Sequence, residues 1–129
     1  MDERTRDHLQ TAQANRKYAL AILQDEIATP TQRNWAAVAA FYAAMHAVNA
    51  YLWEMARLEP ISHRDRREIL SRWSPLQPLI PSYTALFTIS VRARCHPGFV
   101  VDSARLETFV RRHLARVITS IERVLPVEE

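Results

Sequence analysis

The chain has 129 residues, 48% of them hydrophobic, which is enough apolar material to bury the core of one domain. Its formal net charge is +3, with 16 Arg and a single Lys, a surplus that suits a phosphate-bearing partner but can also reflect genomic base composition. The single Gly disfavours hairpin-rich β structure and excludes the glycine loops that cradle nucleotide phosphates. We therefore expect one all-α domain covering residues 1–129.

The only cysteine, Cys95, has no partner for an internal disulfide, so we expect a reduced thiol. No apolar segment follows a charged start, and we accordingly expect no signal peptide and a cytoplasmic protein. The stretch from Trp35 to Trp53 is nearly long enough to cross a bilayer. His46 and Asn49 lie inside it, and polar residues are costly within a membrane, so we predict no membrane span.

The first predicted helix begins with Asp2 or Thr5 as its N-cap. It is expected to end near Ala28, because Pro30 disfavours the helical conformation at the residue before it. Thr31 is then the expected cap of the second helix. The apolar positions of the first helix recur at helical spacing and are Leu9, Ala12, Ala19, Leu20, Leu23 and Ile27.

The second predicted helix, from Trp35 to Ala56, is apolar on every side, and helices of that kind are buried centrally. One of its stripes consists of small residues that let another backbone approach closely, namely Ala36, Ala40, Ala43, Ala47 and Ala50. His46 and Asn49 are polar, and a buried side chain without a hydrogen bond costs roughly 1 to 3 kcal/mol. We expect this pair to form a structural core network with neighbouring helices, the alternative being a catalytic role.

A short basic helix is predicted next, from Ser62, which caps it together with Asp65, to about Trp73. Its basic residues form either a solvated face or a surface that contacts phosphates. The candidate nucleic-acid-binding residues on it are Arg64, Arg66 and Arg67, with His63 beside them.

Two further long helices complete the chain. In the third, Arg94 lies at the end of an apolar stripe, and Pro97 with Gly98 ends the helix. Asp102 caps the last helix. The expected inner stripe of that last helix is Leu106, Phe109, Val110, His113, Val117, Ile121 and Val124. Four long helices with short connections predict an up-down four-helix bundle with an additional short helix.

Four segments carry a family resemblance: NWAAVAAFYAAMHAVNAYL, Pro60-Ile61-Ser62-His63 with nearby Arg64 and Arg67, Tyr83-x-x-Leu86, and SVRAR at positions 90–94. Together, over roughly His8 to Leu125, they resemble the HEPN superfamily (higher eukaryote and prokaryote nucleotide-binding domains). The resemblance implies a four-helix up-down bundle that is commonly a homodimer. It also implies a place in toxin–antitoxin modules, in defence systems, or beside a small nucleotidyltransferase. Many members are metal-independent ribonucleases in which four to six residues separate an Arg from a following His.

This sequence departs from the family motif, because only three residues separate Arg92 from His96 and Ala93 follows the Arg. The candidate catalytic residues are Arg92, Arg94 and His96, with His63 assisting. In the chemistry they would serve, an RNA 2′-hydroxyl attacks its own phosphate, a His moves protons and Arg stabilises the phosphorane charge. Pro97 makes His96 non-helical by preference, so the cluster is either a phosphate site or merely a basic helix end.

The five His residues show no HxxxH spacing and the chain has no CxxC pair, so we expect no metal and no cofactor. Two hypotheses follow. The first is a ribonuclease of a toxin–antitoxin or defence system whose Arg/His clusters meet across a homodimer. The second is a non-catalytic HEPN binding module, either an inactive relative or the accessory partner of a nucleotidyltransferase. The expected partners are a second copy, RNA or a nucleotide, and an antitoxin or a nucleotidyltransferase.

Overall fold

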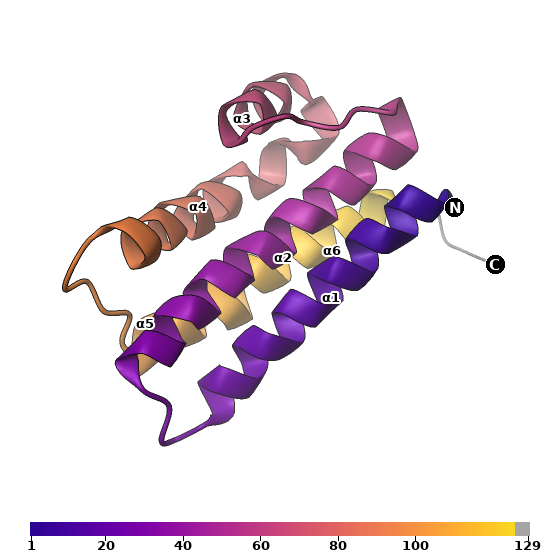
Figure 1. Cartoon of the computed structure of the whole chain (residues 1–129). Helices are drawn as coiled ribbons and strands as arrows, with labels where there is room; N and C mark the ends of the chain where they lie inside the picture. Colours follow the sequence, from indigo (N-terminus) through magenta and orange to yellow (C-terminus); the bar gives the residue numbers. More distant parts are fainter. Residues whose placement is uncertain (126–129) are drawn as a thin grey trace.

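The computed structural model describes residues 1–125, and this part of the chain is helical with no strand. The long helices form four rods, and Figure 1 shows how these are arranged. They are α1 (Glu3–Gln24), α2 (Pro30–Ala56), α4 (Ile80–Cys95) and a last rod in which α5 (Ser103–Glu107), η2 (Thr108–Leu114) and α6 (Ala115–Val124) follow without a break. The short α3 (His63–Arg72) and the 3₁₀ segment η1 (Ser74–Leu79) connect α2 to α4. The predicted all-α bundle is confirmed.

Helix α2 is the centre of the bundle. It packs along α1 on one side and α4 on another, and the last rod lies behind it in Figure 1. Every residue from Ala36 to Leu52 is buried except Tyr42 and His46, which are half-buried. The five alanines of the small-residue stripe are all at most 1% exposed. The apolar character of this segment therefore reflects burial on all sides within the protein, and no described helix is long and apolar enough to cross a membrane.

The start of α2 differs from the prediction in its capping residue. Thr29, not Thr31, is the N-cap: its hydroxyl accepts a hydrogen bond from Gln32 N–H, and the Gln32 side chain accepts one from Thr29 N–H. Pro30 explains the shift. It forces Thr29 into extended backbone, with φ −76° and ψ 160°, and is itself well suited to the first helical position. The predicted cap at Thr31 was therefore wrong, and the true cap lies two residues earlier.

Helix α1 ends four residues earlier than expected, at Gln24. The Asp25 carboxylate accepts a hydrogen bond from Ile27 N–H, a local turn that competes with helix continuation. Ile27 was expected in the apolar stripe and is instead 88% exposed. At the other end of α1 the Asp2 side chain caps the helix by accepting from Arg4 N–H, which resolves the choice between Asp2 and Thr5.

The last rod departs from α-helical geometry in its middle, where η2 is a π-helix. Because a π turn holds more residues than an α turn, it rotates the positions that follow it. Leu114 and Ile118 are buried, whereas the expected inward residues Phe109, His113 and Val124 are half-buried. The predicted inner stripe is thus correct at Leu106, Val110, Val117 and Ile121 and omits Leu114 and Ile118, of which Leu114 fits regular helical spacing between Val110 and Val117.

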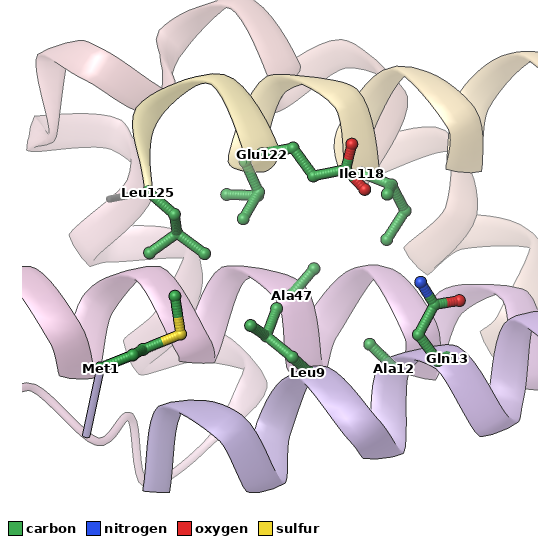
Figure 2. Close-up of a pocket in the computed structure, with 9 residues that line it drawn as sticks. Met1, Leu9, Ala12, Gln13, Ala47, Ile118, Glu122 and Leu125 are labelled. Atoms are coloured by element: carbon green, nitrogen blue, oxygen red, sulfur yellow. The ribbon is translucent and has the colours of Figure 1, made fainter. Parts of the chain in front are cut away.

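An apolar pocket of about 230 Å³ opens where α1 and α6 do not close against each other. Figure 2 shows Leu9 and Ala12 of α1 facing Ile118 and Leu125 across it, with Ala47 of α2 at its floor. The polar side chains of Gln13 and Glu122 lie at its edge.

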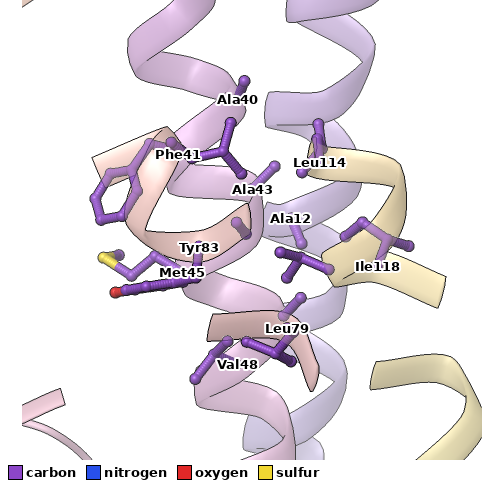
Figure 3. Close-up of a cluster of buried hydrophobic side chains, with 14 of the residues drawn as sticks. Ala12, Ala40, Phe41, Ala43, Met45, Val48, Leu79, Tyr83, Leu114 and Ile118 are labelled. Carbon is purple, nitrogen blue, oxygen red and sulfur yellow. The ribbon is translucent and has the colours of Figure 1, made fainter. Parts of the chain in front are cut away.

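The core proper surrounds the middle of α2. Figure 3 shows Phe41, Met45 and Val48 of α2 packed near Tyr83 of α4 and Leu79 of η1. Phe41 makes an edge-on ring contact with Tyr83, with centroids 5.5 Å apart. This aromatic packing extends from the core toward α3, and it is there that the predicted basic residues gather.

Candidate functional site

Two side-chain hydrogen bonds in the first turn of α3 determine where this helix begins. The Ser62 hydroxyl accepts a hydrogen bond from Asp65 N–H, and the Asp65 carboxylate accepts one from Ile61 N–H. With its start fixed, the helical period places His63, Arg66 and Arg67 on neighbouring positions of one face. That face lies against α2 and α4.

Arg66 is the most unusual residue of this face, because it is only 5% exposed. Its Nε donates to Asn49 Oδ1 of α2 at 2.9 Å, and its Nη1 donates to His63 Nδ1 at 3.1 Å. No carboxylate of the described residues forms an ion pair with it. Buried charges are normally paired, so this guanidinium is a cation without a counter-ion inside residues 1–125.

Tyr83 adds a buried hydroxyl to the surroundings of Arg66. The hydroxyl approaches the guanidinium without reaching hydrogen-bond geometry and has no other partner within the described chain. Burial raises the pKa of Tyr83, and the neighbouring Arg66 opposes that rise in part. The hydroxyl is therefore a neutral donor at physiological pH.

His63 lies against the edge of the same aromatic cluster. Its ring is 5.5 Å from the rings of both Phe41 and Phe87, measured between centroids. Burial lowers the pKa of His63 first of all, and the positive charges of Arg66, Arg94 and Arg67 lower it further. Because Arg can only donate, Nδ1 of His63 is the acceptor and the neutral ring carries its proton on Nε2. His63 is thereby held as a neutral hydrogen-bond donor.

Arg67 and Arg94 complete the cluster from two different helices. The Arg67 guanidinium lies over the Phe87 ring, 4.8 Å from its centroid, and Arg94 is close enough to His63 to lower the pKa of its ring. Both side chains are exposed. We call His63, Arg66, Arg67 and Arg94 the α3–α4 cluster: one buried cation, two exposed cations and one neutral imidazole on an aromatic base.

The other predicted site residues lie outside this cluster. Arg64 is exposed and pairs with Glu68 at 3.7 Å along α3. Arg92 lines a shallow groove between α4 and the last rod, together with Arg105 and Phe109. Arg92 and Arg94 point to different sides of α4, because two residues along an α-helix differ by about 200°. The predicted cluster of Arg92, Arg94 and His96 is accordingly not assembled within one chain.

His96 is exposed and follows the last residue of α4, with extended backbone at φ −103° and ψ 109°. The non-helical conformation expected from Pro97 is confirmed. The backbone N–H of His96 donates to the Arg92 carbonyl at 3.1 Å. Cys95, beside it, is an exposed free thiol.

The core polar pair is hydrogen-bonded to neighbouring helices, as the sequence predicts. Asn49 accepts from Arg66 of α3, and Nδ1 of His46 lies 3.0 Å from Nδ1 of His8 in α1. His8 in turn donates from Nε2 to Glu59 at 3.1 Å. Burial lowers the pKa of His46, as do the nearby His8 and Arg66, while Glu59 acts in the opposite direction.

Sequence reasoning missed His8, Glu59 and Tyr83. His8 and Glu59 are 51 positions apart, and no local pattern joins them. The only signal for them was indirect, since His46 in an apolar helix demanded a polar partner. For Tyr83, nothing in the local sequence indicates that a charge lies beside its hydroxyl.

Neither a metal centre nor the apolar pocket coincides with the cluster. Residues 1–125 contain no group of three or more His, Cys, Asp or Glu side chains arranged to hold a metal ion. The pocket between α1 and α6 is lined by none of the cluster residues. Comparison of the chain with protein-family models, with curated proteins and with solved structures gives no match.

Proposed function

We propose that this chain is a HEPN-like domain that binds a phosphate of an RNA or a nucleotide at the α3–α4 cluster. The observation that supports it most is Arg66, whose buried guanidinium has only neutral hydrogen-bond partners among the described residues. A phosphate would supply the missing negative charge. Arg is suited to this ligand because its planar fork of donors matches phosphate oxygens.

The remaining members of the cluster have complementary tasks. Arg67 and Arg94 are exposed, so they can meet the ligand and attract it from solution. His63 donates from Nε2 as a neutral group. The aromatic base of Phe41 and Phe87 lowers the local dielectric and so strengthens each charge interaction. These groups suit the binding of a phosphate. They do not supply a general base for RNA cleavage, because the Nε2 atom of His63 carries a proton and its Nδ1 atom already accepts from Arg66.

A second candidate function is metal-independent RNA cleavage, and His96 is the residue that favours it. His96 is exposed, lies two residues after Arg94, and its side chain has no hydrogen-bond partner within the described chain. In this mechanism His96 removes the proton from the 2′-hydroxyl, which attacks the adjacent phosphorus, and the arginines stabilise the phosphorane. The leaving 5′-oxygen takes a proton from His96 of a second copy, so a homodimer is needed.

The two candidates assign different biological settings. A ribonuclease of this type would act as a toxin or a defence component, with an antitoxin as its protein partner. A binding module would instead accompany a small nucleotidyltransferase. In neither case is a metal or a cofactor part of the proposed chemistry.

Phosphate binding is tested with a fluorescent nucleoside monophosphate, titrated by anisotropy against the wild type and Arg67→Gln/Arg94→Gln. The double variant removes two cations that face the ligand, and we expect at least a tenfold weaker affinity, since hydrogen bonds to charged groups are each worth about 1.5 to 3 kcal/mol. Arg64→Gln is the matched control, because it removes a charge from α3 that is already paired with Glu68. Equal affinity in the double variant and the control would contradict the proposal.

Cleavage is tested separately, by incubating labelled RNA with the protein in chelator. The binding module predicts no turnover. The ribonuclease predicts turnover that His96→Ala abolishes and that Arg92→Ala, on the far side of α4, leaves largely in place. Turnover that survives His96→Ala would assign the activity to a contaminant.

A further inference from the structure

The last rod carries five exposed arginines that the proposed phosphate site does not use. Four of them line one shallow groove, and Arg105 lines another, between the rod and α4. We call this set the arginine stripe: Arg105, Arg111, Arg112, Arg116 and Arg123. From its first to its last member the stripe extends roughly 27 Å, taking a rise of about 1.5 Å per residue.

No carboxylate of the described residues neutralises the stripe. Glu107 and Glu122 belong to the same rod, yet neither forms an ion pair with any of the five arginines. Glu122 lies instead at the edge of the pocket that faces α1, as Figure 2 shows. This uncompensated charge affects a neighbouring side chain. Burial is the main cause that lowers the pKa of His113, and the positive charges of Arg112 and Arg116 lower it further.

The groups around the arginines are those that contact a sugar–phosphate backbone. The groove lined by Arg112, Arg116 and Arg123 also presents Thr119 and Ser120. A second groove, between α4 and the rod, adds Arg92 beside Arg105. Guanidinium and hydroxyl donors of this kind make most protein contacts to nucleic-acid phosphates and sugars.

The distribution of apolar surface argues against a protein partner for the stripe. A protein–protein interface needs a core of apolar or aromatic anchors. The large exposed apolar side chains of the described chain all lie elsewhere, on or near the first two helices and in the loops: Tyr18, Ile27, Trp35, Met55, Ile61 and Val100. The groove along four of the stripe arginines is lined otherwise by Ala115, Thr119 and Ser120, none of which is a large apolar anchor.

We infer that the arginine stripe binds the phosphate backbone of a nucleic acid without regard to its base sequence. This surface is separate from the α3–α4 cluster, because Arg92 and Arg94 leave α4 on different sides. Its function is to hold the strand, whereas the cluster recognises one phosphate.

The test uses fluorescein-labelled oligouridine and oligothymidine of about 20 nucleotides, titrated by anisotropy between about 50 and 300 mM NaCl. For single strands, the slope of log K against log salt changes by about 0.7 for each phosphate contact. Arg112→Gln/Arg116→Gln should therefore reduce the slope by about 1.4 and weaken binding about 25-fold at 0.1 M salt. Both strands should be affected alike, since they share the backbone.

The matched control is Lys17→Gln/Arg72→Gln, which removes the same charge from exposed positions on α1 and α3. A stripe that binds the strand predicts wild-type slope in this control, whereas binding through net charge alone predicts equal losses in both double variants. Equal losses, or no oligonucleotide binding by the wild type at the lowest salt, would overturn the inference. Nucleoside monophosphate affinity, measured on the same Arg112→Gln/Arg116→Gln protein, should stay unchanged, which keeps this test distinct from that of the α3–α4 cluster. Circular dichroism of every variant verifies that the fold is retained.

Discussion

Arg66 brings a full positive charge into the bundle with Asn49, His63 and Tyr83 as its neighbours. The fold holds the charge in place through neutral acceptors, which satisfy two of the five guanidinium donors but not the charge itself. Such an arrangement sacrifices stability when the ligand is absent, as binding sites commonly do. Stability measurements on single residues can therefore report on the site.

We predict that Arg66→Met lowers the free energy of unfolding by less than Asn49→Leu does, because removing an unpaired buried charge offsets the loss of the donor to Asn49 Oδ1. Asn49→Leu removes the acceptor while the charge remains, and it should lower the free energy of unfolding by about 1 to 3 kcal/mol. Urea denaturation followed by circular dichroism measures both. A greater loss in Arg66→Met than in Asn49→Leu would contradict this account of Arg66.

Three of the half-buried histidines, His46, His63 and His113, give the protein a pH dependence of definite sign. The pKa values of His46, His63 and His113 are all lowered from 6.5 by burial and by neighbouring cations. Below pH 6.5 the unfolded chain therefore binds more protons than the folded chain, and stability falls as the pH drops toward the folded pKa values.

We accordingly predict that the urea midpoint decreases between pH 7.5 and about pH 5.5, and that His46→Gln/His63→Gln decreases less over the same interval. The carboxyl groups of Asp2 and Glu54 also have lowered pKa values, but from 3.8 and 4.5, so their loss comes at lower pH. A midpoint that rises as the pH falls to 5.5 would show that these rings are charged in the folded state.

At the scale of elements, the ends of the helices depend on single side chains. The capping box of α2 joins Thr29 and Gln32 reciprocally and places Pro30 in the first turn. Since α2 is the element against which α1 and α4 pack, loosening its start affects the bundle as a whole.

We predict that Thr29→Ala lowers the free energy of unfolding by about 1 kcal/mol, the usual cost of losing an N-cap. Thr31→Ala is the control, because Thr31 is exposed inside the first turn and caps nothing, and its effect should stay below about 0.5 kcal/mol. Thermal and urea unfolding distinguish the two. Equal costs at both positions would refute the assigned cap.

Some features of the helices can be predicted from local sequence patterns and others cannot. The burial of α2 and the caps at Ser62 and Asp102 follow from local composition, and the structure has them. In the last rod the predicted stripe omitted Leu114 and Ile118, and regular helical spacing does not predict the π-helical geometry of η2. Likewise the sequence brought His63, Arg66 and Arg67 together along α3, but only the packing of α4 against it adds Arg94.

At the scale of the whole molecule, the proposed dimer is constrained by what α4 presents. The groove beside α4 is lined by Arg92 and Arg105 together with the smaller or apolar residues Pro81, Thr84, Ala85, Thr88, Ile89 and Phe109, and no large exposed apolar side chain of the described residues lies on this helix. An interface there would bring arginines of two copies together, and these repel each other unless a phosphate lies between them. Pairing through the end of α4 should therefore be weak without a ligand.

If two copies pair through this end, light scattering should give a mass near that of one 14.9 kDa chain at low micromolar concentration and a higher mass when oligonucleotide is added. Mixed dimers of wild type and His96→Ala should then lose nearly all cleavage. Cleavage near half that of wild type would indicate independent sites within single chains, and a stable dimer without nucleic acid would place the interface on another surface.

The alanine stripe of α2 has a consequence for distant relatives of this chain. Because Ala36, Ala40, Ala43, Ala47 and Ala50 are all shielded from solvent, a larger residue at any of them would push a neighbouring helix outward. Most exposed positions of the bundle carry no such restriction. As related sequences diverge, small residues at spacings of four, three, four and three should therefore persist longest. That spacing, rather than overall identity, is the feature by which remote members of this lineage could be found.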